Sequence, residues 1–493
     1  MVALDISHAR RRPLPQADAP VRAPAAPSAP RRKADAPRPG GPVTPQSVKG
    51  RFRRIKWTSL AFCLAVYGLL PFLRWDRGPD APGQAVLFDF VKGRLYVFFI
   101  EIWPQELYYL TGLLILASLV LILLNAVAGR VWCGFLCPQT VWTDLFLAVE
   151  RAIEGDRRER LRKREAGLGP RRIAELAAKH AAWLAIATWT GAGLVLYFGD
   201  APQTLRDLMA GEASALAYAW VAIIAGLTYL LAGFAREQVC TFMCPWPRLQ
   251  GAIWDPEALT VNYRDYRGEP RGSAKKAEQL RAAGEPAGDC VDCLQCVTVC
   301  PIGIDIREGP NFACINCGLC VDACDGVMTK LNRPTGLIAY ESWTNIERGR
   351  RREPQSRRVI RPKTLGLAAA ALALAGGMGV ALAQRTAGSL TVLHDRNPTA
   401  VRLSDGRVRN GYTLRLVNKD RRARTFAIAV TGGGDVALAL IGSQTVEAEG
   451  DATVEVRATL TGAGAASGPV VFEARDLSGA ARFQAADTFM AAP

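Results

Sequence analysis

Eight cysteines fall within 35 residues, in two runs that share one spacing. The first run reads C-x2-C-x2-C-x3-C-P and comprises Cys290, Cys293, Cys296 and Cys300. The second run has Asp325 in place of the proline and comprises Cys314, Cys317, Cys320 and Cys324. Three thiolates on one tight loop can cover one face of an iron–sulfur cube, and the fourth cysteine of such a run ligates the other cluster. The spacing therefore predicts two 4Fe–4S clusters and a protein that moves electrons one at a time.

Crossed ligation assigns the last cysteine of each run to the cluster that the other run holds. We expect one cluster on Cys290, Cys293, Cys296 and Cys324, and the second on Cys314, Cys317, Cys320 and Cys300. Pro301 is expected to end its turn cleanly, whereas Asp325 leaves a charge beside its loop. A disulfide framework is the alternative, but cysteines at this density would need strained pairings.

Two shorter motifs carry paired thiols. They read C-x3-C-P and place Cys133 and Cys137 before Pro138, and Cys240 and Cys244 before Pro245. We call them the first and second thiol motifs. The i,i+4 spacing predicts both thiols of a motif on one side of a helix, and the proline should end that helix.

The duplication suggests that the two thiol motifs meet in one four-thiolate site. Thiolates suit Cu(I), zinc or iron–sulfur chemistry, and a thiol pair can also cycle through a disulfide. The alternative is that these cysteines are small buried hydrophobes. A duplicated pair followed by proline favours function, and these four cysteines are candidate metal-binding or redox-active residues. Cys63 lacks a partner and is interpreted as packing.

Five apolar stretches are long enough to cross a bilayer as helices. They are residues 55–73, 107–128, 180–198, 215–235 and 364–384. Lysine and arginine alternate between the connecting segments: 13 in 1–56, four in 74–106, 11 in 130–179, one in 199–214 and 19 in 236–363. The positive-inside rule then predicts a multi-pass inner-membrane protein with a cytoplasmic N-terminus, cytoplasmic clusters and thiol motifs, and a periplasmic C-terminal domain.

The net charge of +16 is explained by this sorting and by contact with anionic membrane lipid, so no nucleic-acid partner is expected. The first 50 residues hold ten prolines and almost no aromatics, which predicts a disordered basic tail without a cleaved signal peptide. Three scattered histidines disfavour a histidine-built metal or haem site.

Residues 390–493 contain about seven short β-rich runs separated by turn residues, which predicts an immunoglobulin-like sandwich. We interpret it as a docking module. The predicted fold is a multidomain membrane protein with a five-helix transmembrane bundle, a cytoplasmic ferredoxin-like domain and a C-terminal β-sandwich. The expected domains are a tail (1–50), four spans as two hairpins that each end in a thiol motif (51–260), a two-cluster domain (261–363), a fifth span (364–385) and the sandwich (386–493).

The two thiol motifs, the double run closing in Cys324-Asp325 and the run YTLRLVNKD resemble the cytochrome c oxidase accessory proteins known as FixG or CcoG, over residues 50–493. The resemblance implies an iron–sulfur protein that reduces Cu(II) to Cu(I) for assembly of a cbb-type oxidase. It thereby makes the four cysteines of the thiol motifs the candidate catalytic residues and copper ligands: Cys133, Cys137, Cys240 and Cys244. It implies the oxidase assembly machinery and a copper transporter as partners, and leaves the electron donor unknown. C-x3-C-P also occurs in quinol-oxidising membrane ferredoxins. A quinone-linked electron-transfer protein and an assembly scaffold with structural clusters therefore remain as alternatives.

Overall fold

The structure is a computed structural model that describes residues 43–78, 81–356, 358–386, 388–419, 422–432, 437–440, 445–448, 453–462, 467–477, 479 and 481–491. The predicted disorder of 1–50 therefore lies outside the described residues up to position 42. The chain divides into two compact units. The first comprises residues 1–68, 121–195 and 211–364, and the second comprises 69–120, 196–210 and 365–493.

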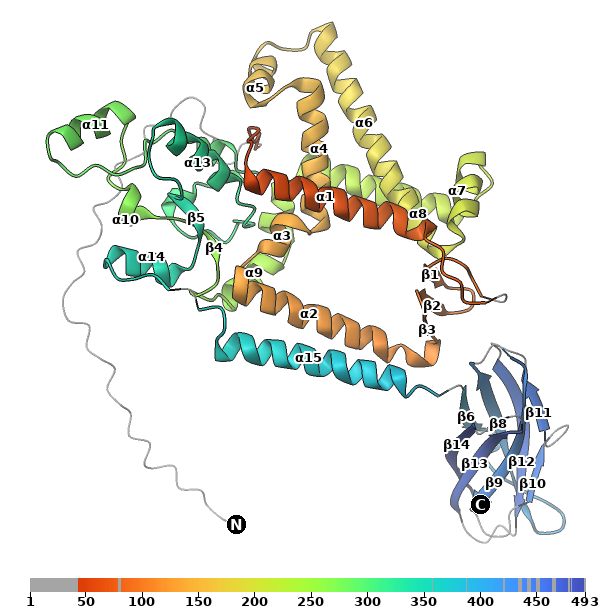
Figure 1. The fold of residues 1–493 in the computed structure, drawn as a ribbon. Helices are drawn as coiled ribbons and strands as arrows, with labels where there is room; N and C mark the ends of the chain where they lie inside the picture. Colours follow the sequence, from red (N-terminus) through yellow and green to blue (C-terminus); the bar gives the residue numbers. More distant parts are fainter. Residues whose placement is uncertain are drawn as a thin grey trace, which may run out of the picture. The chain divides into compact units, whose positions relative to one another are not determined.

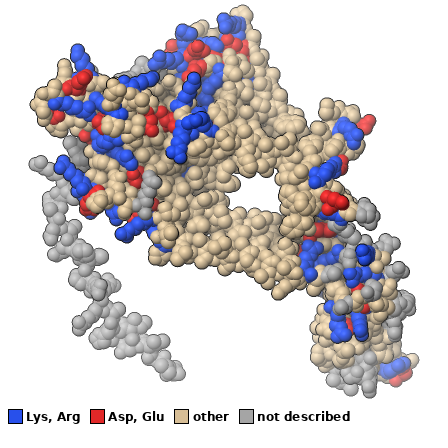
Figure 2. Space-filling model, in the orientation of Figure 1, with Lys and Arg blue, Asp and Glu red and all other residues tan. Residues whose placement is uncertain are grey.

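Five long apolar helices match the five predicted spans (Figure 1). They are α1 (Arg51–Leu69, continued by η1 to Phe72), α2 (Tyr108–Ala128, preceded by η2, Pro104–Glu106), α6 (Pro170–Val195, continued by η3 to Phe198), α8 (Ala215–Leu230, continued by a π-helical turn to Ala235) and α15 (Pro362–Ala383). Only 6% of the most apolar window is buried in α8 and in α15. Apolar helices left this open are expected in lipid and not in a protein core. In Figure 2 the surface over α2 and most of α15 shows no charged side chains.

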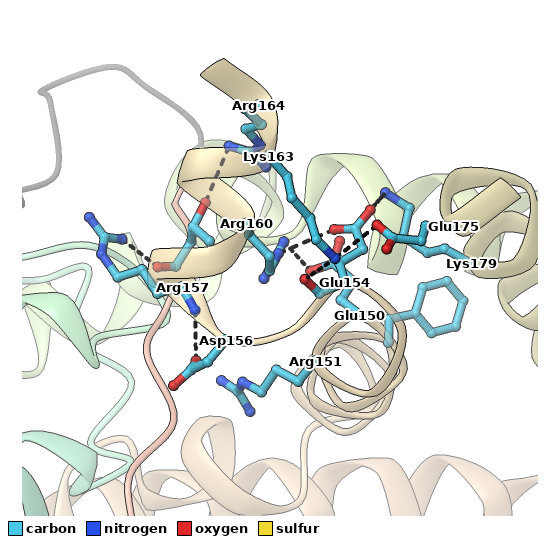
Figure 3. Close-up of polar contacts among 12 residues, drawn as sticks. Glu150, Arg151, Glu154, Asp156, Arg157, Arg160, Lys163, Arg164, Glu175 and Lys179 are labelled. Carbon is cyan, nitrogen blue, oxygen red and sulfur yellow. Dashed lines mark hydrogen bonds and ion pairs between the residues drawn. The ribbon is translucent and has the colours of Figure 1, made fainter. Parts of the chain in front are cut away.

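Two further helices of the first unit are joined to each other and to the start of α6 by buried ion pairs (Figure 3). The two further helices are α4 (Pro138–Glu154) and α5 (Arg157–Glu165). Arg160 on α5 lies 2.5 Å from Glu150 and 3.3 Å from Glu154, and all three side chains are almost fully buried. Lys179 on α6 approaches Glu154 to 3.0 Å. Burial alone would raise the pKa of Glu154, but Lys179 and the guanidinium groups hold that pKa below its usual value. Removing one partner from such a network costs about 3–5 kcal/mol.

The two cysteine runs lie in a small domain closed by an antiparallel pair, β4 (Thr260–Tyr263) with β5 (Ile338–Glu341). Its helices are α10 (Asp265–Gly268), α11 (Ala274–Ala282), α12 (Gln295–Thr298), η6 (Ile306–Glu308), α13 (Leu319–Lys330) and α14 (Trp343–Arg350). Cys324 and Asp325 lie inside α13, where a proline would interrupt the helix. Asp325 is therefore not a loose charge beside a loop: its Oδ1 accepts a hydrogen bond of 2.7 Å from the Gly336 backbone.

Residues 43–50 are folded against this domain, contrary to the predicted disorder, and we call them the strap. The Gln46 backbone N–H donates to the Thr298 carbonyl at 2.9 Å. The Ser47 hydroxyl donates to Asp156, the N-cap residue of α5, at 2.6 Å. The strap thus connects the cluster-bearing domain to α5. Its end leads into α1, whose first backbone N–H groups meet Asp322 of α13: those of Phe52 and Arg53 donate to that carboxylate at 3.1 and 2.8 Å.

Alanine at Gly50 is expected to destabilise the protein. The new Cβ would lie 2.2 Å from Cγ of Asp322 and would displace the carboxylate that caps α1. Loss of a helix cap costs about 1 kcal/mol. The control is Gly326→Ala within α13, where a Cβ would have nothing within 4 Å and should stabilise the helix by about 0.5–1 kcal/mol. Thermal denaturation of the two variants should move the midpoint in opposite directions, and equal midpoints would contradict the capping role of Asp322.

The second unit contains a β-sandwich and a small sheet. The small sheet comprises β1 (Val86–Asp89), β2 (Arg94–Val97) and β3 (Ile100–Ile102), and α7 (Ala201–Ala210) belongs to the same unit. One sheet of the sandwich has the order β10 (Ala437–Leu440), β12 (Thr453–Gly462), β8 (Val408–Asn418) and β6 (Gly388–His394), with β7 (Val401–Arg402) also paired to β8. The other has the order β11 (Thr445–Ala448), β9 (Arg424–Gly432), β13 (Gly468–Asp476) and β14 (Arg482–Phe489).

The predicted sandwich is confirmed. Alternate residues of β8 and β13 form its core, and Leu414, Leu416 and Phe472 are fully buried there. Two short strands, β7 and β11, had no counterpart in the sequence prediction. They are two and four residues long, too short to show an alternating pattern.

Candidate iron–sulfur and thiol site

Each predicted set of four cluster ligands lines its own cavity. The first cavity is lined by Cys290, Cys293, Cys296 and Cys324, with Arg307 among the other wall residues. The second is lined by Cys300, Cys314, Cys317 and Cys320. Each cavity thus collects the three leading cysteines of one run and the last cysteine of the other, although Cys296 also reaches the wall of the second cavity. All 13 cysteines, each within the described part of the chain, are free thiols.

The donor set and its surroundings fit a 4Fe–4S cluster in each cavity. Burial raises the pKa of Cys300 to about 11, while backbone N–H groups of Ile302, Gly303 and Ile304 act in the opposite direction by hydrogen bonding to its sulfur. Such N–H groups and nearby charge tune a cluster's reduction potential. In the first cavity the charge is Arg307, which is 8% exposed and pairs with Asp292 at 2.7 Å and Asp305 at 2.6 Å. When bound, the clusters would supply one-electron transfer, and these residues would hold and tune them.

The two thiol motifs share one arrangement, in which the first cysteine is helical and the second is extended, and this differs from the predicted single helix face. Cys133 lies in the short helix α3 (Val131–Phe135) and Cys240 in a π-helical turn (Val239–Met243). Cys137 and Cys244 follow in extended conformation, with ψ of 129° and 127°. The cause is the following proline, which disfavours helical geometry in the residue before it. Each proline then leads into a new helix, α4 after the first motif and α9 (Trp246–Ala252) after the second.

The four thiols of the two motifs are close enough to influence one another electrostatically. Burial raises the pKa of Cys240 to about 11, and the charges of Cys137, Cys133 and Cys244 add to the shift. Burial likewise raises the pKa of Cys133, opposed by the Arg130 guanidinium. Cys133 and Cys240 therefore carry protons at neutral pH until a metal displaces them. Among the residues that the structure describes, no three His, Cys, Asp or Glu side chains form a ready-made single-ion site.

Both thiol motifs adjoin the second cluster cavity. Cys133 packs in one apolar core with Ile315 and Cys317. A pocket lined by Cys240 shares three wall residues with the second cavity, namely Pro301, Ile302 and Ile315. The thiol motifs are thus one layer of residues from the cluster held by the second run.

The sequence did not point to two residues that bring the first thiol motif close to the loop of the second run. Arg130, just before the first motif, donates through Nη1 to the carbonyls of Phe312 at 2.5 Å and Cys314 at 3.3 Å. Gly134 lies so close to the second run that a Cβ would come within 2.6 Å of the Ile315 carbonyl oxygen. The glycine inside the first motif was the only signal, and the second motif has Thr241 at the matching position.

Gly134→Ala is expected to remove iron from the second cavity. The obstructing atoms are the backbone oxygens of Ile315 and Asn316, which cannot move without moving the loop that carries Cys314 and Cys317. Iron content should fall from about eight toward about four per chain, the content of two and of one cube. Gly326→Ala is the control, since its Cβ would meet nothing. Full iron content in Gly134→Ala would contradict close docking of the first motif on this loop.

The fold and the site together define a membrane-bound iron–sulfur electron-transfer protein with an appended β-sandwich. Comparisons with known proteins agree. A "4Fe-4S dicluster domain" family matches residues 235–343, and a "4Fe-4S binding domain" family matches residues 110–154, where the only cysteines are Cys133 and Cys137. A family described as "IG-like fold at C-terminal of FixG" matches residues 378–492.

Relatives extend the match to most of the chain, which belongs to the FixG family. The nitrogen fixation protein FixG of Rhizobium meliloti is 45% identical over 79% of this chain and 79% of its own length. Protein RdxA of Cereibacter sphaeroides is 46% identical over 86% of this chain and 90% of its own length. Protein RdxB of the same organism is 48% identical over 81% of this chain and 84% of its own. The crystal structure of a FixG-related protein from Vibrio parahaemolyticus covers 22% of this chain and 97% of its own, at 23% identity and a TM-score of 0.20, too low to support an argument.

Proposed function

We propose that this protein reduces Cu(II) to Cu(I) at the thiol motifs, with electrons supplied through the two clusters, for assembly of a cbb-type cytochrome c oxidase. The observation that carries the proposal is the wall of Pro301, Ile302 and Ile315, which the Cys240 pocket shares with the second cluster cavity. Copper is the substrate in this proposal. Soft thiolates favour the Cu(I) product over Cu(II), so the same residues that bind the ion also draw the electron to it.

The arrangement of the two cluster cavities and the thiol motifs supports electron flow from the clusters to the thiols. The two cavities meet at Cys296, which lines both. The second cavity in turn adjoins the thiol motifs. Electrons that reach either cavity therefore have a short route to the thiols, and each Cu(II) takes one electron.

The test is a titration of purified, anaerobic protein. Its clusters are first reduced with dithionite, excess reductant is removed, and Cu(II) is added. We expect about two Cu(I) formed per chain, one for each reduced cluster, followed in the visible absorbance of the clusters and with a Cu(I)-specific chelator. Clusters that stay reduced in the presence of Cu(II) would refute copper reduction and leave the clusters as structural parts or as donors to another acceptor.

We also propose the membrane orientation. The alternation of lysine and arginine along the chain supports a cytoplasmic N-terminus, cytoplasmic clusters and thiol motifs, and a periplasmic sandwich in the inner membrane. Reporter fusions after residues 150 and 340 should report the cytoplasm, and fusions after 90, 205 and 450 the periplasm. A cytoplasmic signal at 450 would show that α15 does not cross.

The sandwich would then dock the oxidase assembly machinery, with a copper transporter supplying the ion on the thiol side. Contact with anionic lipid accounts for the remaining basic charge, and no nucleic-acid partner is proposed.

A further inference from the structure

Another pocket, separate from the one lined by Cys240, also borders the second cluster cavity. It lies on a wall different from that facing the thiol motifs. Its cavity volume is about 50 Å³, against about 20 Å³ for each cluster cavity. It shares Val261 and Cys314 with the cluster cavity. A molecule in this pocket is therefore separated from the cluster by one of the cluster's own ligands. Its other lining residues include Arg130, Gln250, Trp254, Asn311 and Phe312.

Two lining side chains have buried polar atoms without a hydrogen-bond partner among the described residues. Gln250 is 8% exposed and its Oε1 is unpartnered. Arg130 is 5% exposed and its Nε is unpartnered. An orphaned buried polar atom costs about 1–3 kcal/mol, so such atoms commonly have a partner that joins them from outside. Here the amide can accept from a ligand hydroxyl, and the guanidinium can donate to a ligand oxygen.

The rim of the pocket is aromatic and lies beside the end of an apolar helix. Trp254 is 43% exposed and Phe312 is 67% exposed. Arg130 follows the end of the α2 span by two residues. Aromatic side chains at the end of a span are typical of the membrane–water interface, so a ring dissolved in the lipid can reach this pocket and pack against them.

We propose that this pocket binds a membrane hydroquinone and that the ring is the electron donor to the clusters. The inference rests on the proposed electron transfer through the clusters and names the class of their donor. In the reaction the two O–H bonds of the hydroquinone break, two protons leave to water at the open mouth, and two electrons pass to the two oxidised clusters, one to each. The product is the quinone.

The lining favours a hydroquinone over a flavin nucleotide. A nucleotide needs a cationic cradle for its phosphate, and Arg130 is the only cation in the described lining. Its Nη1 is already bonded to the Phe312 and Cys314 carbonyls. A neutral ring with two oxygens matches the two orphaned atoms.

The first test is photolabelling of the full-length, cluster-containing protein with a short-chain azidoquinone. Labelled peptides should contain Trp254 or Phe312, and excess decylubiquinone should suppress the label. Gln250→Leu removes the amide at similar size and should weaken labelling about five- to tenfold, the effect of one lost hydrogen bond. Gln279→Leu is the matched control, since Gln279 is an exposed residue of α11, and it should label as the unaltered protein does.

The second test follows cluster reduction. Decylubiquinol should bleach the cluster absorbance of the unaltered protein and of Gln279→Leu at the same rate. It should bleach the cluster absorbance of Gln250→Leu about five- to tenfold more slowly. Dithionite should reduce all three equally, which shows that the clusters are intact. Label at other peptides, or a Gln250→Leu protein that binds and reacts normally, would overturn the hydroquinone site. The copper titration uses dithionite as the reductant, so its result does not depend on the hydroquinone pocket. Failure of the hydroquinone site and failure of copper reduction can therefore be distinguished.

Discussion

A protein with serine at Cys133, Cys137, Cys240 and Cys244 should lose copper binding and copper reduction while keeping about eight irons per chain, the content of two cubes. A serine hydroxyl is a hard, weakly bound ligand for Cu(I), whereas the thiolate is soft. The eight cysteines of the two runs are untouched and keep their own cavities. The measurement is copper and iron content after anaerobic dialysis, together with Cu(II) titration of the dithionite-reduced variant.

Cys63→Ser is the matched control, because this cysteine lies in α1 away from both motifs in the sequence and should be dispensable. Variants with serine in one motif alone separate a joint site from two independent pairs: a joint site loses copper in either case, while independent pairs retain half. A different result would be about twelve irons in the unaltered protein and about eight in the four-serine variant. The motifs would then hold a third cluster, and the copper proposal would be wrong.

Single serines at the ends of the two runs should remove opposite clusters. Cys324 lines the first cavity with Cys290, Cys293 and Cys296, so Cys324→Ser should lose that cluster. Cys300 lines the second cavity, so Cys300→Ser should lose the cluster of the second run. Each variant should hold about four irons instead of about eight. Electron paramagnetic resonance of the reduced protein should show a different remaining signal in each.

The two signals can be assigned with serine at Cys293 and at Cys317, which belong to different cavities. Under crossed ligation Cys324→Ser resembles Cys293→Ser, and Cys300→Ser resembles Cys317→Ser. The reverse pairing would show that each run serves its own cluster.

The sequence was sufficient for features governed by local patterns. Cysteine spacing predicted which thiols share a cavity, because each run supplies three neighbouring thiols to one cavity and its last thiol to the other. Apolar length predicted all five long helices, even the alanine-rich α15, because few charges interrupt it. Alternation predicted the longer strands of the sandwich, where β8 and β13 bury every second residue.

Features that depend on distant partners could not be predicted. The strap has the composition of a disordered tail, and only Thr298 and Asp156, 252 and 109 positions away, explain why it folds. Gly134 resembles any helix glycine until the Ile315 carbonyl faces it. The conformation of Cys137 and Cys244 was mispredicted because the restriction imposed by proline on the preceding residue outweighed the helical spacing.

The strap also bears on the order in which the molecule is assembled. Chains fold from the N-terminus during synthesis, so the strap, α1, the first thiol motif and α5 are made well before Thr298 and Asp322. The cluster-bearing domain is therefore synthesised after the segments of the first unit that it packs against. A fragment of residues 261–363 expressed alone would lack the chain that covers Thr298 and the helix end that Asp322 caps. The iron–sulfur part thus relies, for part of its packing, on chain that precedes it by more than 200 residues.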